Sequence, residues 1–135
     1  MSDRQLSNGQ PVPADDSHKE IDPQTGMQRG YVVLTAEERS KGFVNPCRDS
    51  YVHTCGTVTR MGRVIAETYA RDPWFYNGTF CVGCGAHFPL DQFHWDRDGE
   101  PLDPLKWSPE TFDRVRKAKA ALRPSQAMED CDGKG

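Results

Sequence analysis

The sequence predicts a small α+β fold of one domain, in which a short hairpin packs on one or two helices between polar tails. Turn-forming residues are frequent, with ten prolines and twelve glycines among 135 residues, and strand-like and helix-like segments alternate along the chain. Only 36% of the residues are hydrophobic and the mean hydropathy is −0.77. A core of this size leaves little net stability, so such chains often need a metal ion or disulfides as well.

The ends of the chain are the most polar parts. Residues 1–28 are dominated by Ser, Asn, Gly, Gln, Pro and Asp, which predicts a flexible N-terminal tail. Residues 124–135 predict a second, shorter tail. The folded α+β domain is therefore expected over 29–123. We expect no secretion and no membrane span, because the N-terminus lacks an apolar segment and no apolar run approaches ~20 residues.

The first elements of the folded part follow from local signals. Residues 31–34 read as a short strand. Thr35 and Glu38 have the spacing of a capping box, which predicts a short helix to Lys41 that Gly42 ends.

A longer helix is predicted over 58–71. Four apolar residues fall within roughly 80° of one another on a helical wheel: Val58, Met61, Ile65 and Tyr69. Thr57 can cap its start, and the Asp-Pro pair at 72–73 ends it.

The last third of the chain predicts a hairpin and a helix. A strand at 93–95 and a strand near 101–102 flank a turn with the sequence Asp-Arg-Asp-Gly. Ser108, followed by Pro109 and an acid, is a strong helix start, and the helix should run to about Leu122.

Two cysteine motifs predict a metal site. Cys81 and Cys84 form a Cys-x-x-Cys-Gly knuckle, and upstream His53 and Cys55 form a His-x-Cys-Gly segment. Zinc prefers four tetrahedral ligands from thiolate and imidazole, and Cys-x-x-Cys lets one turn supply two of them. The two segments would be brought together by the intervening helix. We therefore expect a structural Zn²⁺ held by His53, Cys55, Cys81 and Cys84.

Other ligands are possible from the sequence alone. Cys47 or His87 could replace His53 as the fourth ligand, and Cys131 lies in the C-terminal tail as a bystander. Alternatively, the cysteines are small buried residues and the histidines are ordinary surface or core groups. Five cysteines without an export signal favour reduced thiols over a disulfide framework.

The composition of the site favours a structural metal over a catalytic one. Three cysteines and one histidine close the zinc shell, whereas a catalytic zinc keeps an open position. The deaminase, Walker, nucleophile-elbow and His-Glu-x-x-His patterns do not occur. The sequence therefore predicts a protein that is not an enzyme.

Charged and aromatic residues suggest two kinds of partner surface. Arg60, Arg63 and Arg71 would share one face of the predicted helix and could contact phosphates, although Glu67 could equally pair with the last two. The net charge of −3 argues weakly against a nucleic-acid binder.

Aromatic residues before the knuckle could form a stacking platform or an interaction hot spot, and at least two are expected to cover the metal site: Trp74, Phe75, Tyr76 and Phe80.

The chain resembles a group of small zinc-motif proteins encoded by tailed bacteriophages and prophages. The resemblance covers about half of the chain and omits the N-terminal tail and the last helix. It rests on these motifs: Tyr31-Val-Val-Leu-Thr-Ala-Glu-Glu-Arg, Ser50-Tyr-x-His-x-Cys-Gly-Thr-Val-Thr, Ile65-Ala-Glu-Thr-Tyr-Ala-Arg-Asp-Pro, Phe75-Tyr, Thr79-Phe-Cys-x-x-Cys and His87-Phe-Pro. It implies a phage-encoded protein located in a bacterial host cytoplasm or in a virion, and it implies no particular activity.

Together these features predict a non-enzymatic structural-zinc module that binds a protein partner, as a virion component or as a modulator of a host factor. The alternative is a nucleic-acid-binding zinc protein that uses the Arg60, Arg63 and Arg71 face.

Overall fold

The computed structural model describes residues 3–122, which form a mixed α and β fold with small sheets and three α-helices. The predicted C-terminal tail and Cys131 lie outside these residues. The helices are α1 (Ala36–Arg39), α2 (Arg63–Arg71) and α3 (Pro109–Ala120). Short 3₁₀ turns cover Ser17–Lys19, Leu90–Gln92 and Pro104–Lys106. Within this part of the chain, no helix has the length and apolarity that crossing a membrane requires.

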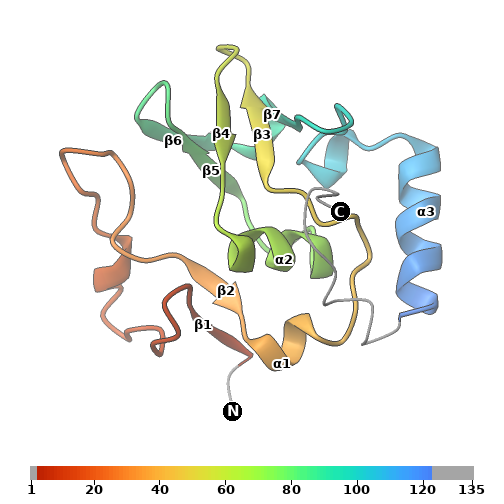
Figure 1. The fold of residues 1–135 in the computed structure, drawn as a ribbon, viewed down its shortest axis with the longest axis horizontal. Coiled ribbons are helices and arrows are strands. Elements are labelled where there is room, and N and C mark those ends of the chain that lie inside the picture. The colour runs from red at the N-terminus through yellow and green to blue at the C-terminus, as the bar shows by residue number, and fades with distance from the viewer. Residues whose placement is uncertain (1–2, 123–135) are drawn as a thin grey trace.

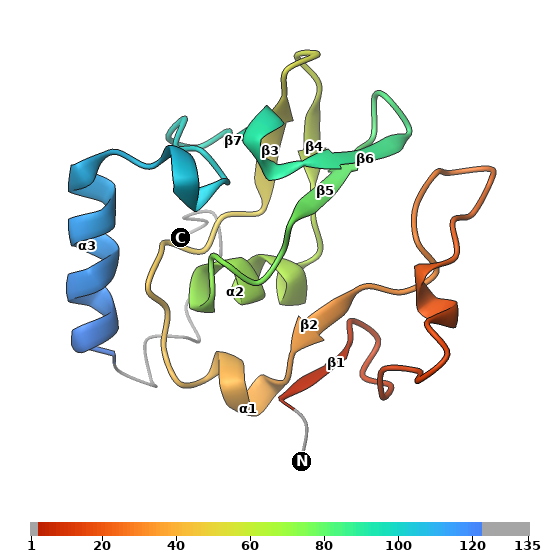
Figure 2. The ribbon, with the colours of Figure 1, turned by 180° about the vertical axis from the view of Figure 1, so that it is seen from behind.

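The strands of the described residues pair into three antiparallel sheets. Strand β1 (Arg4–Leu6) pairs with β2 (Val32–Leu34), and β5 (Gly78–Cys81) pairs with β6 (Ala86–Pro89). The central sheet has the order β4-β3-β7, from Val58–Arg60, Ser50–His53 and Phe93–Trp95. Figures 1 and 2 show α2 below the β3–β4 and β5–β6 hairpins, with α3 at one side of the molecule and the N-terminal segment at the other.

Several predicted elements are present. The Thr35 hydroxyl accepts a hydrogen bond from the Glu38 backbone N–H at 3.3 Å and begins α1. The Ser108 hydroxyl accepts one from the Thr111 N–H at 3.2 Å and begins α3. The predicted turn after β7 exists, although its second arm is only a bridge between His94 and Pro101.

The prediction of a helix over 58–71 is wrong in its first third. Residues 58–60 form β4, and the helix begins at Arg63 with Gly62, not Thr57, as its cap. The β-branched residues Val58 and Thr59 fit a strand, and they pair with Val52 and Tyr51 of β3. Cross-strand pairing therefore outweighs the helical periodicity.

The N-terminal segment, predicted to be a tail, contributes to the fold. Leu6 of β1 lies opposite Val32 and is buried, and Tyr76 donates a hydrogen bond from its hydroxyl to the Val32 carbonyl at 2.5 Å. The turn at Gly26 lies directly against the backbone carbonyl of Gly85. The sequence of this segment gives little indication of a strand, because only the three residues of β1 pair with β2.

Aromatic side chains dominate the core beneath the central sheet. Tyr51 makes edge contacts with Phe93 and Trp95, with ring centroids 5.4 and 6.4 Å apart, and Tyr69 of α2 contacts Trp95 at 5.5 Å. Such pairs add to the stabilisation from buried apolar area. They fix α2 against the strands that carry the cysteine motifs.

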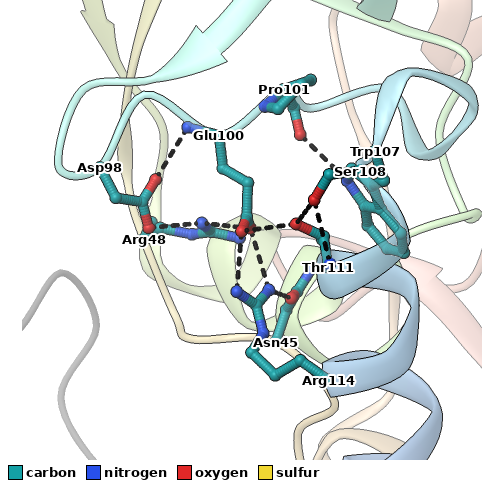
Figure 3. A network of polar contacts seen from close by, with 9 residues as sticks. All are labelled: Asn45, Arg48, Asp98, Glu100, Pro101, Trp107, Ser108, Thr111 and Arg114. Carbon is teal, nitrogen blue, oxygen red and sulfur yellow. Dashed lines mark hydrogen bonds and ion pairs between the residues drawn. The ribbon is translucent and has the colours of Figure 1, made fainter.

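A buried polar network joins α3 to the rest of the fold (Figure 3). The guanidinium of Arg48 is 1% exposed and lies 2.8 Å from Asp98 and 3.0 Å from Glu100. Glu100 also pairs with Arg114 of α3 at 2.7 Å, and Arg114 contacts the Asn45 amide oxygen. The basic last helix therefore docks on a carboxylate of the acidic segment before it.

Candidate metal centre

Two hairpin turns supply the four residues predicted to bind a metal ion. His53 ends β3 and Cys55 lies in the turn to β4, while Cys81 ends β5 and Cys84 lies in the turn to β6. The two turns close with backbone bonds between residues 53 and 56 and between residues 81 and 85, each of 2.8 Å. Gly85 has a φ of 67°, which a glycine adopts without steric cost, so the second turn can bend tightly behind Cys84.

The ligand atoms of these residues converge on one point. The imidazole nitrogen and the three sulfurs all lie within 4.8 Å of one another. Cys55 Sγ is 3.7 Å from Cys81 Sγ, and Cys84 Sγ is 3.7 Å from His53 Nδ1. A disulfide requires sulfurs about 2.05 Å apart, so these thiols are not bonded to each other. The cluster could hold a metal ion.

The cluster is buried on one side and open on the other. His53 and Cys81 are buried, whereas Cys55 and Cys84 are exposed. A metal ion here would be anchored in the core by one ligand from each turn, and the other two ligands would close the shell from the surface.

Neighbouring side chains orient His53. Its Nε2–H donates to the amide oxygen of Gln92 at 2.7 Å, which leaves Nδ1 as the nitrogen that faces Cys84. Phe88 stacks on the imidazole with centroids 4.3 Å apart, and Phe93 contacts it at 4.8 Å. A hydrogen bond to the second ring nitrogen is the usual way in which proteins fix a metal-binding histidine.

The thiols have unequal acidities. Hydrogen bonds from the Thr57 hydroxyl and N–H, with a further contribution from His53, lower the pKa of Cys55 to about 6. The hydrogen bond to Cys55, together with partial desolvation, raises the pKa of Cys84 to about 11. Burial lowers the pKa of His53, but its hydrogen bonds to Gln92 and Cys55 outweigh burial and raise it. The site thus favours one thiolate and resists a second, unless a cation lies between them.

The absence of a side chain at Gly83 allows the two turns to approach. A Cβ atom at Gly83 would lie 2.2 Å from the hydroxyl of Thr57. Gly83 is between Cys81 and Cys84, and Thr57 follows Cys55 by two positions. Any larger residue at 83 would push the two ligand pairs apart.

The alternative ligands lie elsewhere. Cys47 is buried in the main core cluster, and His87 points its Nε2 at the Tyr31 hydroxyl, 2.8 Å away. Neither belongs to the four-residue cluster.

The aromatic residues that contact the four-residue cluster differ from those predicted. Trp74 packs on Trp107 near α3, and Phe75 packs on Tyr76. The rings against His53 are instead Phe88 and Phe93. Phe93 lies opposite His53 because β3 pairs with β7. This pairing joins distant segments, so a run of neighbouring aromatic residues in the sequence does not show which rings contact the site.

The predicted arginine face does not form on one helix. Arg60 lies on β4 and pairs with Asp49 at 2.9 Å, while Arg63 pairs with Glu67 at 2.9 Å. Arg71 ends α2 and contacts the Gly42 carbonyl at 3.5 Å. The alternative prediction, an ion pair between Arg63 and Glu67, is confirmed.

Sequence reasoning missed three supporting residues, Gln92, Thr57 and Gly83. A glutamine before a strand and a glycine inside a knuckle carry no distinctive signal until the two turns are placed together.

Comparisons of this chain with protein-family models, with curated proteins and with solved structures found no match.

Proposed function

We propose that the chain is a non-enzymatic module whose fold is held by one structural Zn²⁺, bound by His53, Cys55, Cys81 and Cys84. The observation that carries the proposal is the convergence of these four ligand atoms from two hairpin turns. Zinc with bonds of about 2.3 Å to sulfur and about 2.05 Å to nitrogen places tetrahedral ligands about 3.6–3.8 Å apart. The two contacts of 3.7 Å match this spacing.

The proposed role of the metal is structural because of the donor set. Three thiolates and an imidazole fill a tetrahedral shell and leave no position for a substrate. All four members of the cluster are histidine or cysteine, and none is a carboxylate that could act as a base beside the metal.

The proposed activity is binding of a protein partner, in a phage virion or with a host factor. Its support is an exposed apolar surface formed by Trp74, Leu105 and Phe112, which are 52%, 87% and 42% exposed. Trp74 and Phe112 both pack on Trp107, with centroid distances of 5.3 and 5.2 Å. Rigid aromatic groups of this kind often dominate protein interfaces. Nucleic-acid binding has less support, because Arg60 and Arg63 are engaged with carboxylates.

Metal analysis of the purified chain tests the first half of the proposal. About one zinc per chain is expected, with loss of the cooperative unfolding transition after chelation. Purified protein that stays folded and metal-free would overturn it.

Comparison of surface variants tests the second half. A partner crosslinked by the wild-type protein should be lost with Trp74→Ala and with Leu105→Asp, but retained by Val82→Ser, which changes an exposed apolar residue elsewhere. Equal crosslinking by all four proteins would exclude this surface as the partner-binding site.

A shift assay near 50 mM salt tests the nucleic-acid alternative, since phosphate contacts strengthen as salt is lowered.

A further inference from the structure

A second candidate site lies between the N-terminal segment and the β5–β6 hairpin, where a cavity of about 660 Å³ opens. Val12, His18 and Tyr31 contribute one wall, and Phe75, Asn77 and His87 contribute the other. Figures 1 and 2 show these two parts of the chain on the same side of the molecule, away from α3. Cavities of 300–1,000 Å³ are the usual size for small-molecule sites.

The most unusual residue of this cavity is His18. Its side chain is 5% exposed, and neither ring nitrogen has a hydrogen-bond partner among the described residues. An unpaired buried polar group destabilises the folded state, so proteins rarely keep one without a use. Each ring nitrogen of an imidazole can make one hydrogen bond, which a bound molecule could supply.

A second imidazole lines the same cavity in a fixed position. The Tyr31 hydroxyl lies 2.8 Å from His87 Nε2 and also accepts a hydrogen bond from the Gln28 N–H at 3.2 Å. Burial lowers the pKa of His87 and so favours the neutral form of this ring. The cavity therefore holds polar groups from both walls, and those of Tyr31 and His87 are held in place before any ligand binds.

The charged and aromatic residues of the lining indicate the class of ligand. Arg4 and Lys19 supply two positive charges at the rim of the cavity. Their ion pairs with Asp3 and Asp16 are long, at 4.0 and 3.9 Å, and solvent-exposed, so they are weak and leave both cations able to attract an anion. The Arg4 guanidinium lies over the Phe75 ring at 4.7 Å, so charge and flat apolar surface are adjacent. Such a lining favours a flat ring that carries an anionic group.

We propose that this cavity binds a small organic anion with a flat ring, such as a nucleoside monophosphate or an aromatic carboxylate. His18 hydrogen-bonds the polar edge of the ligand, the aromatic residues contact the ring, and Arg4 and Lys19 attract the anion. The site is separate from the proposed zinc cluster and shares none of its four residues.

Calorimetric titration of the full chain tests this proposal with adenosine monophosphate, uridine monophosphate and benzoate as probes. At least one should bind with a Kd below about 1 mM, and adenosine, phenol or inorganic phosphate alone should bind at least about tenfold more weakly. The two kinds of probe distinguish a nucleotide from an aromatic acid.

His18→Leu should weaken binding by at least about tenfold while the Tm stays the same or rises, because the variant removes an unpaired buried group. His94→Leu changes an exposed histidine on β7 and should leave binding unchanged. If His18→Leu fails to fold, NMR shift changes at His18 and Tyr31 of the wild-type chain serve instead. Absence of binding by all three probes up to about 5 mM, or binding that leaves both residues unperturbed, would overturn the proposal.

Discussion

Cys55 Sγ lies 3.7 Å from Cys81 Sγ, although the two residues are 26 positions apart in the chain. The helix α2 and the strand β4 fill the interval, so the contact joins two hairpins that have no sheet pairing with each other. A cross-link at this point restricts both hairpins and the helix between them. The stability of the whole fold should therefore depend on the cluster.

We expect Cys81→Ser to abolish zinc binding and lower the Tm by at least about 10 °C, because losing even ~3 kcal/mol shifts a domain of this size by that amount. Cys81 is fully buried at the contact between the turns. Thermal unfolding followed by circular dichroism, with zinc measured on the same sample, provides the test. Val82→Ser in the same turn is the control, because Val82 is 59% exposed and should tolerate the change. Equal Tm values for the two variants would contradict the prediction.

Gly83→Ala should weaken metal binding and destabilise the protein by about 1–3 kcal/mol, because the added Cβ would displace Thr57 and with it the turn that carries Cys55. Competition with a chelator of known affinity measures the first effect, and urea unfolding measures the second. The matched control is Gly62→Ala, where a Cβ meets no atom within 4 Å and φ is −66°. A Gly83→Ala protein that binds zinc as tightly as Gly62→Ala would show that the two turns can separate without cost.

Signals confined to a few neighbouring residues were the most predictable from sequence. The caps at Thr35 and Ser108 and the strand near 32–34 depend on local chemistry, and the structure contains them. The four residues of the cluster could also be selected, because cysteine and histidine spacing is itself the signal of a metal knuckle.

Features that depend on distant pairing could not be predicted. Val58 and Thr59 fit a helical wheel as well as a strand, and only the ladder with β3 decides between them. The strand β1 is three residues long, lies in a polar segment and is stabilised by pairing with β2, so the local sequence does not indicate it. Gln92 and Phe88 support His53 because the two hairpins meet there, which no local pattern reveals.

Gln92→Ala should reduce zinc affinity by about 10–100-fold, because Gln92 fixes the ring and the tautomer of His53. Gln92→Glu retains an acceptor at the same place and should restore most of the affinity. Chelator competition measures both variants. If Gln92→Ala and Gln92→Glu bind zinc as the wild-type chain does, the hydrogen bond does not contribute to metal binding.

The stability of the docked α3 should depend on pH through Glu100. Burial acts to raise the pKa of Glu100, but hydrogen bonds and charges from Arg114 and Arg48 outweigh burial and lower it to about 2, from an ordinary value of 4.5. The folded state therefore favours ionised Glu100, and this contribution is complete above about pH 5. It is lost as the pH falls from about 4.5 toward 2, because protons then bind the unfolded chain more readily than the folded one.

Glu100→Gln isolates this contribution, because both proteins carry the same four metal ligands and are compared only at pH values where both still unfold cooperatively. The difference in unfolding free energy between wild type and Glu100→Gln should be largest near neutral pH and should shrink as the pH falls below about 4.5. Urea unfolding followed by tryptophan fluorescence measures it, since Trp95 and Trp107 lie beside the network. The control is Glu110→Gln, an exposed change on α3, which should give a much smaller difference near neutral pH. A difference for Glu100→Gln that stays constant with pH would mean that packing, rather than the charge shared with Arg48 and Arg114, holds α3 in place.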